Sequence, residues 1–317
     1  MEMRLRADVR AVSLDGALCG IERAGVAIRL PTAVARSLLD GDTRFLTGPL
    51  AQALDQHGFV EPGIEHREPD VDRNAVFAAA LCGDDSTTSL AGLAQHQYVI
   101  LGCGGIGSNT AVALAALGAT RILVTDDDRI EAGNLNRLLW ASPAEVGELK
   151  CEALARHLRN QFNIDCVSAA VRTSAETVRR VHESLAGSAT WVIAVDDPTS
   201  AREAAGYLHG RPHTCYIHAG YVGARCVVGP MAFRDGDPCP FCSASRYRVD
   251  NRGYVAPSAA PNNLMITAML AAQLLRAAGT EPAASALHQA RWTLDLISGI
   301  AQTTPMTKST ECEVCSR

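Results

Sequence analysis

The spacing of apolar and polar positions predicts a strand, a helix and a second strand between residues 98 and 125. Tyr98–Leu101 is a short apolar run, typical of a strand that is buried on both faces. We predict a helix over Ala111–Leu117, with Gly118 just after its end, because glycine readily adopts the left-handed conformation found there. Ile122–Thr125 is apolar and β-branched and predicts a second buried strand. The order is that of a parallel strand–helix–strand unit.

The same periodicity predicts further elements on both sides of this unit. Toward the C-terminus, we predict a helix from Lys150 to about Asn160, and strands at 166–171, 191–195 and within 213–223. Toward the N-terminus, we predict strands near Val9–Leu14, Val26–Leu30 and Phe59–Val60, and helices over 31–39, Thr47–His57, 75–83 and Ser86–His96. The result is an α/β fold with a mainly parallel, Rossmann-like sheet.

The charged, proline-containing segment 61–72 is a predicted linker between two domains. Residues 1–60 are predicted to form a small α+β module that resembles a winged helix, and residues 73–317 the larger domain. Such modules often bind DNA, but helix 47–57 carries no lysine or arginine. We therefore favour an exposed strand edge that accepts a peptide strand. The alternative is a simple packing or dimerisation appendage.

Composition restricts the class of protein. Of the 317 residues, 47% are apolar and 20% are charged, which is typical of a soluble globular chain. The formal net charge of −5, without a run of lysine or arginine, argues against nucleic acid or a membrane surface as a partner. The sequence has no signal peptide and no apolar stretch of about 18 residues, so we expect a cytoplasmic protein.

Glycines follow the first buried strand in the spacing of a nucleotide-binding turn. Gly102, Gly104 and Gly107 form G-x-G-x-x-G, which brings backbone N–H groups against a phosphate at a helix N-terminus; Gly105 lies inside the same turn. Asp126 ends the second strand about 20 residues later, where an acid binds a ribose in such folds. This pattern alone leaves NAD, FAD, S-adenosylmethionine and ATP open.

Two cations and a further acid favour ATP. Arg137 and Lys150 are suited to the β- and γ-phosphates of a triphosphate, and a dinucleotide site does not require them. The alternative for Lys150 is an ordinary solvated helix lysine. Asp196 follows strand 191–195, and a carboxylate at that edge of a parallel sheet can hold Mg²⁺ against the phosphates.

Four of the eleven cysteines occur as two C-x-x-C pairs. Cys239 and Cys242 form the first pair, and Cys312 and Cys315 form the second. Together they predict a zinc-ribbon-like site with four thiolates, which has no open position and is therefore structural. The alternative, a redox dithiol, leaves the second pair without a role.

These residues resemble the ubiquitin-activating-enzyme-like (ThiF/MoeB-type) adenylating family over about residues 73–315. The marks of the resemblance are GCGGIGS (102–108), the acidic strand end 126–128, NLNR (134–137), the lysine of VGELK (150), the strand-end aspartate 196, and CPFC with CEVC. Together these motifs are specific, although none is specific alone.

The resemblance implies an ATP site and an adenylation reaction. In such a site Asp126 binds the ribose within an acidic strand end that includes Asp128, Gly102–Gly107 leaves room for the phosphates, Asn134, Arg137 and Lys150 contact the triphosphate, and Asp196 holds Mg²⁺. Arg73 resembles an arginine that this family inserts into the partner subunit's active site, which implies a homodimer. The implied reaction is attack of a C-terminal carboxylate on the α-phosphate, which gives an acyl-adenylate and pyrophosphate.

Departures from the family pattern narrow the branch. Residues 243–302 contain no cysteine, which argues against covalent transfer through that segment. Leu138 stands where glutamine is usual, and Asp196-Asp197-Pro198 replaces D-x-T-D-N, which leaves either aspartate as the magnesium ligand. With HAGYVG (218–223) and APNN (260–263), the chain looks closer to the microcin C-type enzymes.

We therefore expect residues 1–60 to bind a short ribosomally made precursor peptide, whose C-terminal carboxylate the larger domain adenylates in the biosynthesis of a modified peptide. Two alternatives stay open. One is adenylation of a ubiquitin-like sulfur carrier, and the other is a non-catalytic, peptide-binding scaffold subunit.

Overall fold

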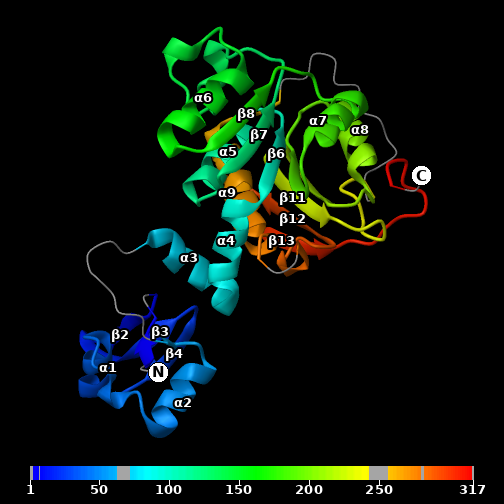
Figure 1. The fold of residues 1–317 in the computed structure, drawn as a ribbon. Coiled ribbons are helices and arrows are strands. Elements are labelled where there is room, and N and C mark those ends of the chain that lie inside the picture. The colour runs from blue at the N-terminus through cyan, green and yellow to red at the C-terminus, as the bar shows by residue number, and fades with distance from the viewer. Residues whose placement is uncertain (1–2, 7, 63–71, 243–255, 280–281, 316–317) are drawn as a thin grey trace. The chain divides into compact units, whose positions relative to one another are not determined.

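A computed structural model describes residues 3–6, 8–62, 72–242, 256–279 and 282–315 (Figure 1). The chain divides into two compact units, residues 1–87 and 88–317. Most of the linker predicted at 61–72 lies outside the described residues. Within the described part, no helix has both the length and the apolar character needed to cross a membrane.

In its described residues, the first unit contains two small antiparallel sheets and three α-helices. β1 (Met3–Leu5) pairs with β5 (Val60–Pro62), and β2 (Arg10–Leu14), β3 (Ala17–Arg23) and β4 (Val26–Arg29) form a meander. The helices are α1 (Thr32–Leu39), α2 (Gly48–Gln56) and α3 (Arg73–Cys82), with short 3₁₀ turns at Thr43–Phe45 and Gly83–Asp85. The predicted α+β composition is confirmed.

The middle strand β3 was not predicted. Gly20 interrupts its apolar pattern, because a Cβ there would lie 2.2 Å from the carbonyl oxygen of Ile28 on the neighbouring strand. Ile21, one residue further on, is fully buried and packs with Leu38, Leu54 and Phe59 in the core of this unit.

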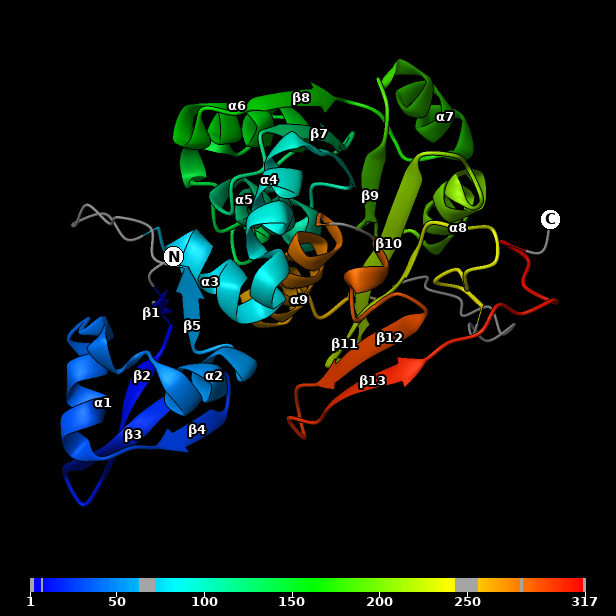
Figure 2. The ribbon, with the colours of Figure 1, turned by 60° about the horizontal axis from the view of Figure 1, so that its bottom comes forward.

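The second unit is built on one eight-stranded sheet in the order β13-β12-β11-β10-β9-β6-β7-β8. Five neighbouring strands, β10, β9, β6, β7 and β8, run parallel, and β11, β12 and β13 continue the sheet as an antiparallel meander (Figure 2). The bounds are β6 (Gln97–Leu101), β7 (Arg121–Thr125), β8 (Asp165–Ala169), β9 (Ala189–Ile193), β10 (Thr214–Val222), β11 (Arg225–Ala232), β12 (Ala290–Asp295) and β13 (Ala301–Pro305). The predicted, mainly parallel α/β sheet is confirmed.

Helices cover both faces of this sheet (Figure 1). α5 (Gly105–Ala116), α6 (Lys150–Phe162) and α9 (Ala260–Ala277) pack together on one face, and α7 (Ala175–Ser184) and α8 (Pro198–Leu208) lie on the other. α4 (Ser86–Gln95) precedes β6, and 3₁₀ turns occupy Ala132–Asn134, Pro143–Glu145 and Pro282–Ala284. Trp191, at the centre of β9, is fully buried against α7 and α8.

The order of strands fixes where a ligand can bind. The chain leaves β6 toward β7 on one side and later returns to β9 on the other side. In open α/β sheets, such a reversal opens a crevice at the carboxyl ends of the two central strands, and ligands bind there. The glycine turn follows β6 and Asp196 follows β9, so both lie at this edge of the sheet.

Candidate nucleotide and zinc sites

Two glycines allow the turn after β6 to approach its neighbours closely. Gly102 has a φ of +93°, and a Cβ there would lie 2.8 Å from the carbonyl oxygen of Ala194, just beyond β9. A Cβ at Gly107 would lie 1.9 Å from the carbonyl oxygen of Gly102. Gly104 is the N-cap of α5, and a Cβ there would meet open space. Gly104 therefore leaves open space at the N-terminus of α5, as a phosphate site requires.

Asp126 is anchored to the glycine turn. Its Oδ2 accepts a hydrogen bond from the Cys103 amide at 2.6 Å, and its Oδ1 accepts one from the Asp128 amide at 2.8 Å. Burial raises the pKa of Asp126, and the two amide hydrogen bonds oppose that shift. The acid predicted to bind a ribose is thus fixed beside the turn predicted to bind phosphate.

Lys150 is a buried member of the same cluster rather than a solvated helix lysine. It opens α6, and its Nζ lies 2.7 Å from Asp128 Oδ2. Its backbone amide also donates to the Asp128 carbonyl at 2.9 Å. The Asp128 side chain itself is 69% exposed. An ammonium group has three donors, so Lys150 can keep Asp128 and still contact a phosphate oxygen.

Arg137 packs against the glycine turn from the NLNR segment. Its Cγ would lie 3.0 Å from a Cβ at Gly105, and its Nη1 donates to the Gly133 carbonyl at 3.1 Å and to Asn136 Oδ1 at 3.0 Å. No carboxylate pairs with this guanidinium among the described residues, so its charge is available to an anion. Asn134 is buried, and its Oδ1 accepts the Glu131 amide at 3.2 Å.

Two buried asparagines complete this wall. Neither was predicted as a site residue, although Asn263 belongs to the APNN segment (260–263). Asn109 in α5 donates through Nδ2 to the carbonyls of Gly105, at 2.6 Å, and Arg137, at 2.9 Å. Asn263 in α9 places its Oδ1 2.7 Å from where a Cβ of Gly105 would lie. Asn109 could have been identified as a polar residue inside an apolar helix, whereas Asn263 lies far away in sequence.

The two aspartates after β9 differ in their contacts. Asp197 is the N-cap of α8, and its carboxylate accepts from the Thr199 amide at 3.3 Å and from the amide and hydroxyl of Ser200 at 3.1 and 2.7 Å. The Ser200 hydroxyl holds the pKa of Asp197 below its usual value. The Asp196 side chain is exposed, and its carboxylate has no hydrogen bond or ion pair within the described residues. Asp196 is therefore the acid that remains free to bind a cation.

Arg73 lies in the first unit. It is the first residue of α3, and Asp72 caps this helix by accepting the amides of Asn74, at 2.9 Å, and Ala75, at 3.3 Å. The Arg73 side chain is exposed. Its action in a partner subunit's site stays a prediction.

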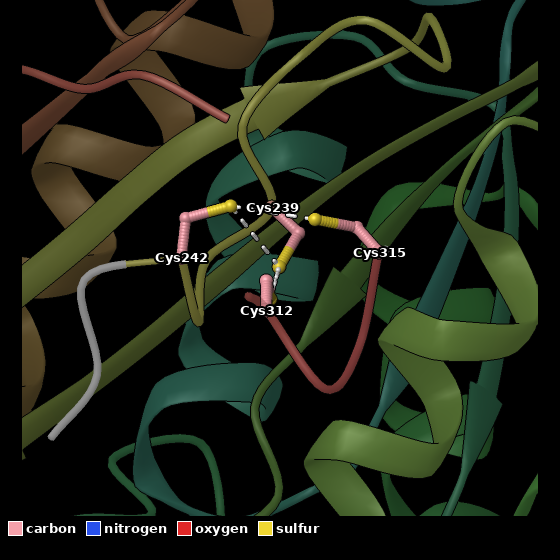
Figure 3. Close-up of side chains that lie close together, drawn as sticks. All are labelled: Cys239, Cys242, Cys312 and Cys315. Carbon is pink, nitrogen blue, oxygen red and sulfur yellow. Dashed lines mark hydrogen bonds between the residues drawn. The ribbon is translucent and has the colours of Figure 1, made fainter. Parts of the chain in front are cut away.

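The two cysteine pairs meet although they are far apart in sequence (Figure 3). Sγ distances are 3.5 Å between Cys239 and Cys312, 3.4 Å between Cys242 and Cys315, and 3.8 Å between Cys239 and Cys242. All four sulfur atoms lie within 4.8 Å of one another. A tetrahedral zinc ion with Zn–S bonds of about 2.3 Å requires sulfur atoms about 3.8 Å apart, so this cluster fits zinc.

Comparison with known proteins identifies a family and similar solved structures. A family model described as the ThiF family matches residues 73–314. E. coli MccB with MccA-N7isoASN superposes with a TM-score of 0.82 at 22% identity, covering 100% of both chains. E. coli MccB with ATP superposes with a TM-score of 0.79 at 23% identity, covering 99% of this chain and 100% of that one. At this identity the likeness establishes the fold.

Curated relatives match shorter regions. The SAMP-activating enzyme E1 of Haloferax volcanii is 35% identical over 108 residues, which cover 33% of this chain and 38% of that protein. The adenylyltransferase and sulfurtransferase UBA4 of Meyerozyma guilliermondii is 33% identical over 90 residues, which cover 28% of this chain and 21% of that protein. The matches thus span well under half of these relatives. Because the family model covers more than half of the chain, the protein belongs to the ThiF family, as its glycine turn, NLNR segment and paired cysteines indicated.

Proposed function

We propose that this protein uses ATP to adenylate the C-terminal carboxylate of a short, ribosomally made precursor peptide in the biosynthesis of a modified peptide. The supporting observation is the extent of the likeness to MccB. It covers 100% of both chains and so includes the first unit, whereas the ThiF family model begins only at residue 73. MccB is described as a microcin C7 biosynthetic enzyme and has been solved with N-formylated MccA.

The residues around the crevice are suited to this chemistry. We assign Asp126 to the ribose, the glycine turn with the α5 N-terminus to the phosphates, and Arg137, Lys150 and Asn134 to the triphosphate. Asp196 would hold Mg²⁺, which would supply further charge neutralisation. A carboxylate oxygen of the peptide bonds to the α-phosphorus while the bond to the bridging oxygen breaks, and pyrophosphate leaves with that electron pair. The step moves no proton, so it requires alignment and positive charge more than a protein base.

We assign peptide capture to the first unit and a structural role to zinc. β2 and β4 are the outer strands of the three-stranded sheet, and an extended peptide can pair with such an edge. Zinc on the four cysteines would fasten the C-terminal segment to the core under β9 and β10, because Cys239, Cys312 and Cys315 pack into the cluster around Trp191. We further propose a homodimer in which Arg73 acts in the partner's site.

Adenylation of a sulfur carrier is the second candidate. It is favoured by the names of curated relatives such as UBA4, an adenylyltransferase and sulfurtransferase. The lack of cysteine in residues 243–302 disfavours transfer of the activated group to a thiol in that segment.

ATP–pyrophosphate exchange separates the two candidates. The peptide encoded beside the gene should stimulate exchange, and its product should carry the mass of an adenylate or a derivative of it. A ubiquitin-like carrier ending in Gly-Gly should give little exchange at equal concentration. Exchange driven equally by the carrier would overturn the peptide assignment. A protein that binds no ATP in a calorimetric titration would instead be a non-catalytic scaffold.

A further inference from the structure

Basic side chains from separate elements gather around the first cysteine pair. His218 lies on β10 opposite Ile193, the last residue of β9, so it stands at the same sheet edge as Asp196. Its ring centroid is 5.3 Å from that of Phe241, which lies between the two cysteines of the pair. Burial and the two nearby arginines, Arg291 and Arg202, lower the pKa of His218 to about 4, so the imidazole is neutral and can donate one hydrogen bond.

Two arginines bring positive charge to Pro240 and Phe241, between the cysteines of the first pair. Arg202 lies in the second turn of α8, the helix that Asp197 caps, and its guanidinium carbon is 5.4 Å from the Phe241 ring centroid. Arg291 reaches over from β12 and donates through Nη2 to the Pro240 carbonyl. No carboxylate pairs with Arg202 within the described residues.

The predicted zinc site also attracts positive charge. Four thiolates and one zinc ion carry a net charge of about −2, and the charge of Arg291 interacts with Cys239 and Cys242. Arg202 lies over the ring of Phe241 and belongs to α8, the helix that begins directly after Asp196 and Asp197.

We propose that Arg202, with His218 and Arg291, forms a subsite that holds the substrate's C-terminal carboxylate beside the nucleotide before adenylation. This inference rests on the proposed function. A carboxylate that attacks a triphosphate must approach a group of the same charge, and a guanidinium at the approach offsets the repulsion. Arg202 offers a planar, bidentate donor to the carboxylate, and the neutral imidazole of His218 can donate one further hydrogen bond.

The test compares two synthetic forms of the peptide encoded beside the gene, one with a free C-terminal carboxylate and one with a C-terminal amide. Loss of a charge-assisted hydrogen bond costs about 1.5–3 kcal/mol, so Arg202→Gln should weaken binding of the free acid by about 10- to 100-fold. The same variant should bind the amide as wild type does, and its ATP affinity and zinc content should be unchanged. Arg202→Lys should recover part of the loss.

Arg211→Gln is the matched control. Arg211 follows α8 at its other end, stacks on Tyr207 at 3.8 Å and donates to the Tyr207 carbonyl, away from the crevice edge. This variant should bind both peptides as wild type does.

The binding results distinguish failure of the subsite from failure of the proposed function. If wild type binds neither form of the peptide, the proposed function fails and the subsite with it. If wild type binds acid and amide equally, or Arg202→Gln binds the acid as tightly as wild type, the subsite is refuted while the proposed function stands. If Arg202→Gln loses zinc together with peptide affinity, the arginine serves the cysteine site, which also overturns the proposal.

Discussion

Alanine at Gly107 and alanine at Gly104 should separate the folding role of the glycine turn from its binding role. A Cβ at Gly107 would lie 1.9 Å from the Gly102 carbonyl oxygen and 3.0 Å from Ile100 Cγ2. At Gly104 the backbone has φ −69° and ψ −169°, which alanine adopts freely, and its Cβ would meet no atom within 4 Å. The same methyl group is thus added at two places in one turn, with opposite steric consequences.

The size of the effect at Gly107 follows from which atoms collide. The obstructing oxygen belongs to the backbone of the turn, so relief requires α5 to move away from β6 by about 1 Å or more. Overpacking of this kind costs about 1–3 kcal/mol, and we expect the upper half of that range because no side chain can rotate away. For a unit of this size, each kcal/mol lowers Tm by about 2–4 °C. Gly107→Ala should therefore lower Tm by about 4–12 °C.

Scanning calorimetry and an ATP titration measure the two roles separately. Gly104→Ala should melt within about 2 °C of wild type, yet bind ATP at least about tenfold more weakly, because its methyl group occupies the space in front of the α5 N-terminus. Equal melting temperatures for Gly107→Ala and wild type would refute the steric reasoning. Wild-type ATP affinity in Gly104→Ala would show that the phosphates do not approach the turn there.

Three further predictions concern the metals and pH. Cys312→Ser should release zinc and lower Tm by at least about 6 °C, since the metal site stabilises the fold by several kcal/mol. Cys226 is a buried cysteine outside the cluster, so Cys226→Ala should keep zinc by elemental analysis. Zinc retained in Cys312→Ser would contradict the four-thiolate site. Asp196→Asn should abolish magnesium-dependent ATP–pyrophosphate exchange and leave Tm unchanged. Asp197→Asn keeps a capping oxygen, so it should lower stability by no more than about 1 kcal/mol and retain that activity. The reverse pattern would mean that Asp197 binds the cation. Burial raises the folded-state pKa of Asp126, so its contribution to the free energy of unfolding is full below its unfolded-state pKa and is lost as pH rises through the folded-state pKa. The stability of wild type relative to Asp126→Asn, measured by urea unfolding from acidic to neutral pH, should therefore fall across that interval. A constant difference would disprove the shift.

Local pattern was sufficient for the elements that carry short motifs. The strand–glycine turn–helix–strand order around residues 98–125 is confirmed, although α5 begins at Gly105 rather than near Ala111, because the glycines already form its first turn. The antiparallel meander β11–β13 was not predicted as such. Its strand β13 is exposed along its whole length, so its sequence lacks the alternation that marks a half-buried strand.

In the candidate site, some features also have a local sequence signature and others do not. The cap formed by Asp197 has a sequence signature, an aspartate followed by proline at the first helical position, which favours Asp196 as the cation ligand. The burial of Lys150 has no such signature. It depends on Asp128, 22 residues earlier, and its neighbours on α6 do not reveal it.

By itself, the sequence determined which chemical groups the protein offers: a glycine-rich turn, acids at strand ends, two cations and two cysteine pairs. Spacing over a few residues encodes these groups, because turns, caps and C-x-x-C pairs are local structures. Only the tertiary structure decided which of them meet. The paired cysteines come from segments 73 residues apart, and Asn263 reaches Gly105 from a distant helix. Such contacts arise from the packing of the whole sheet and its helices, which no short stretch of sequence records.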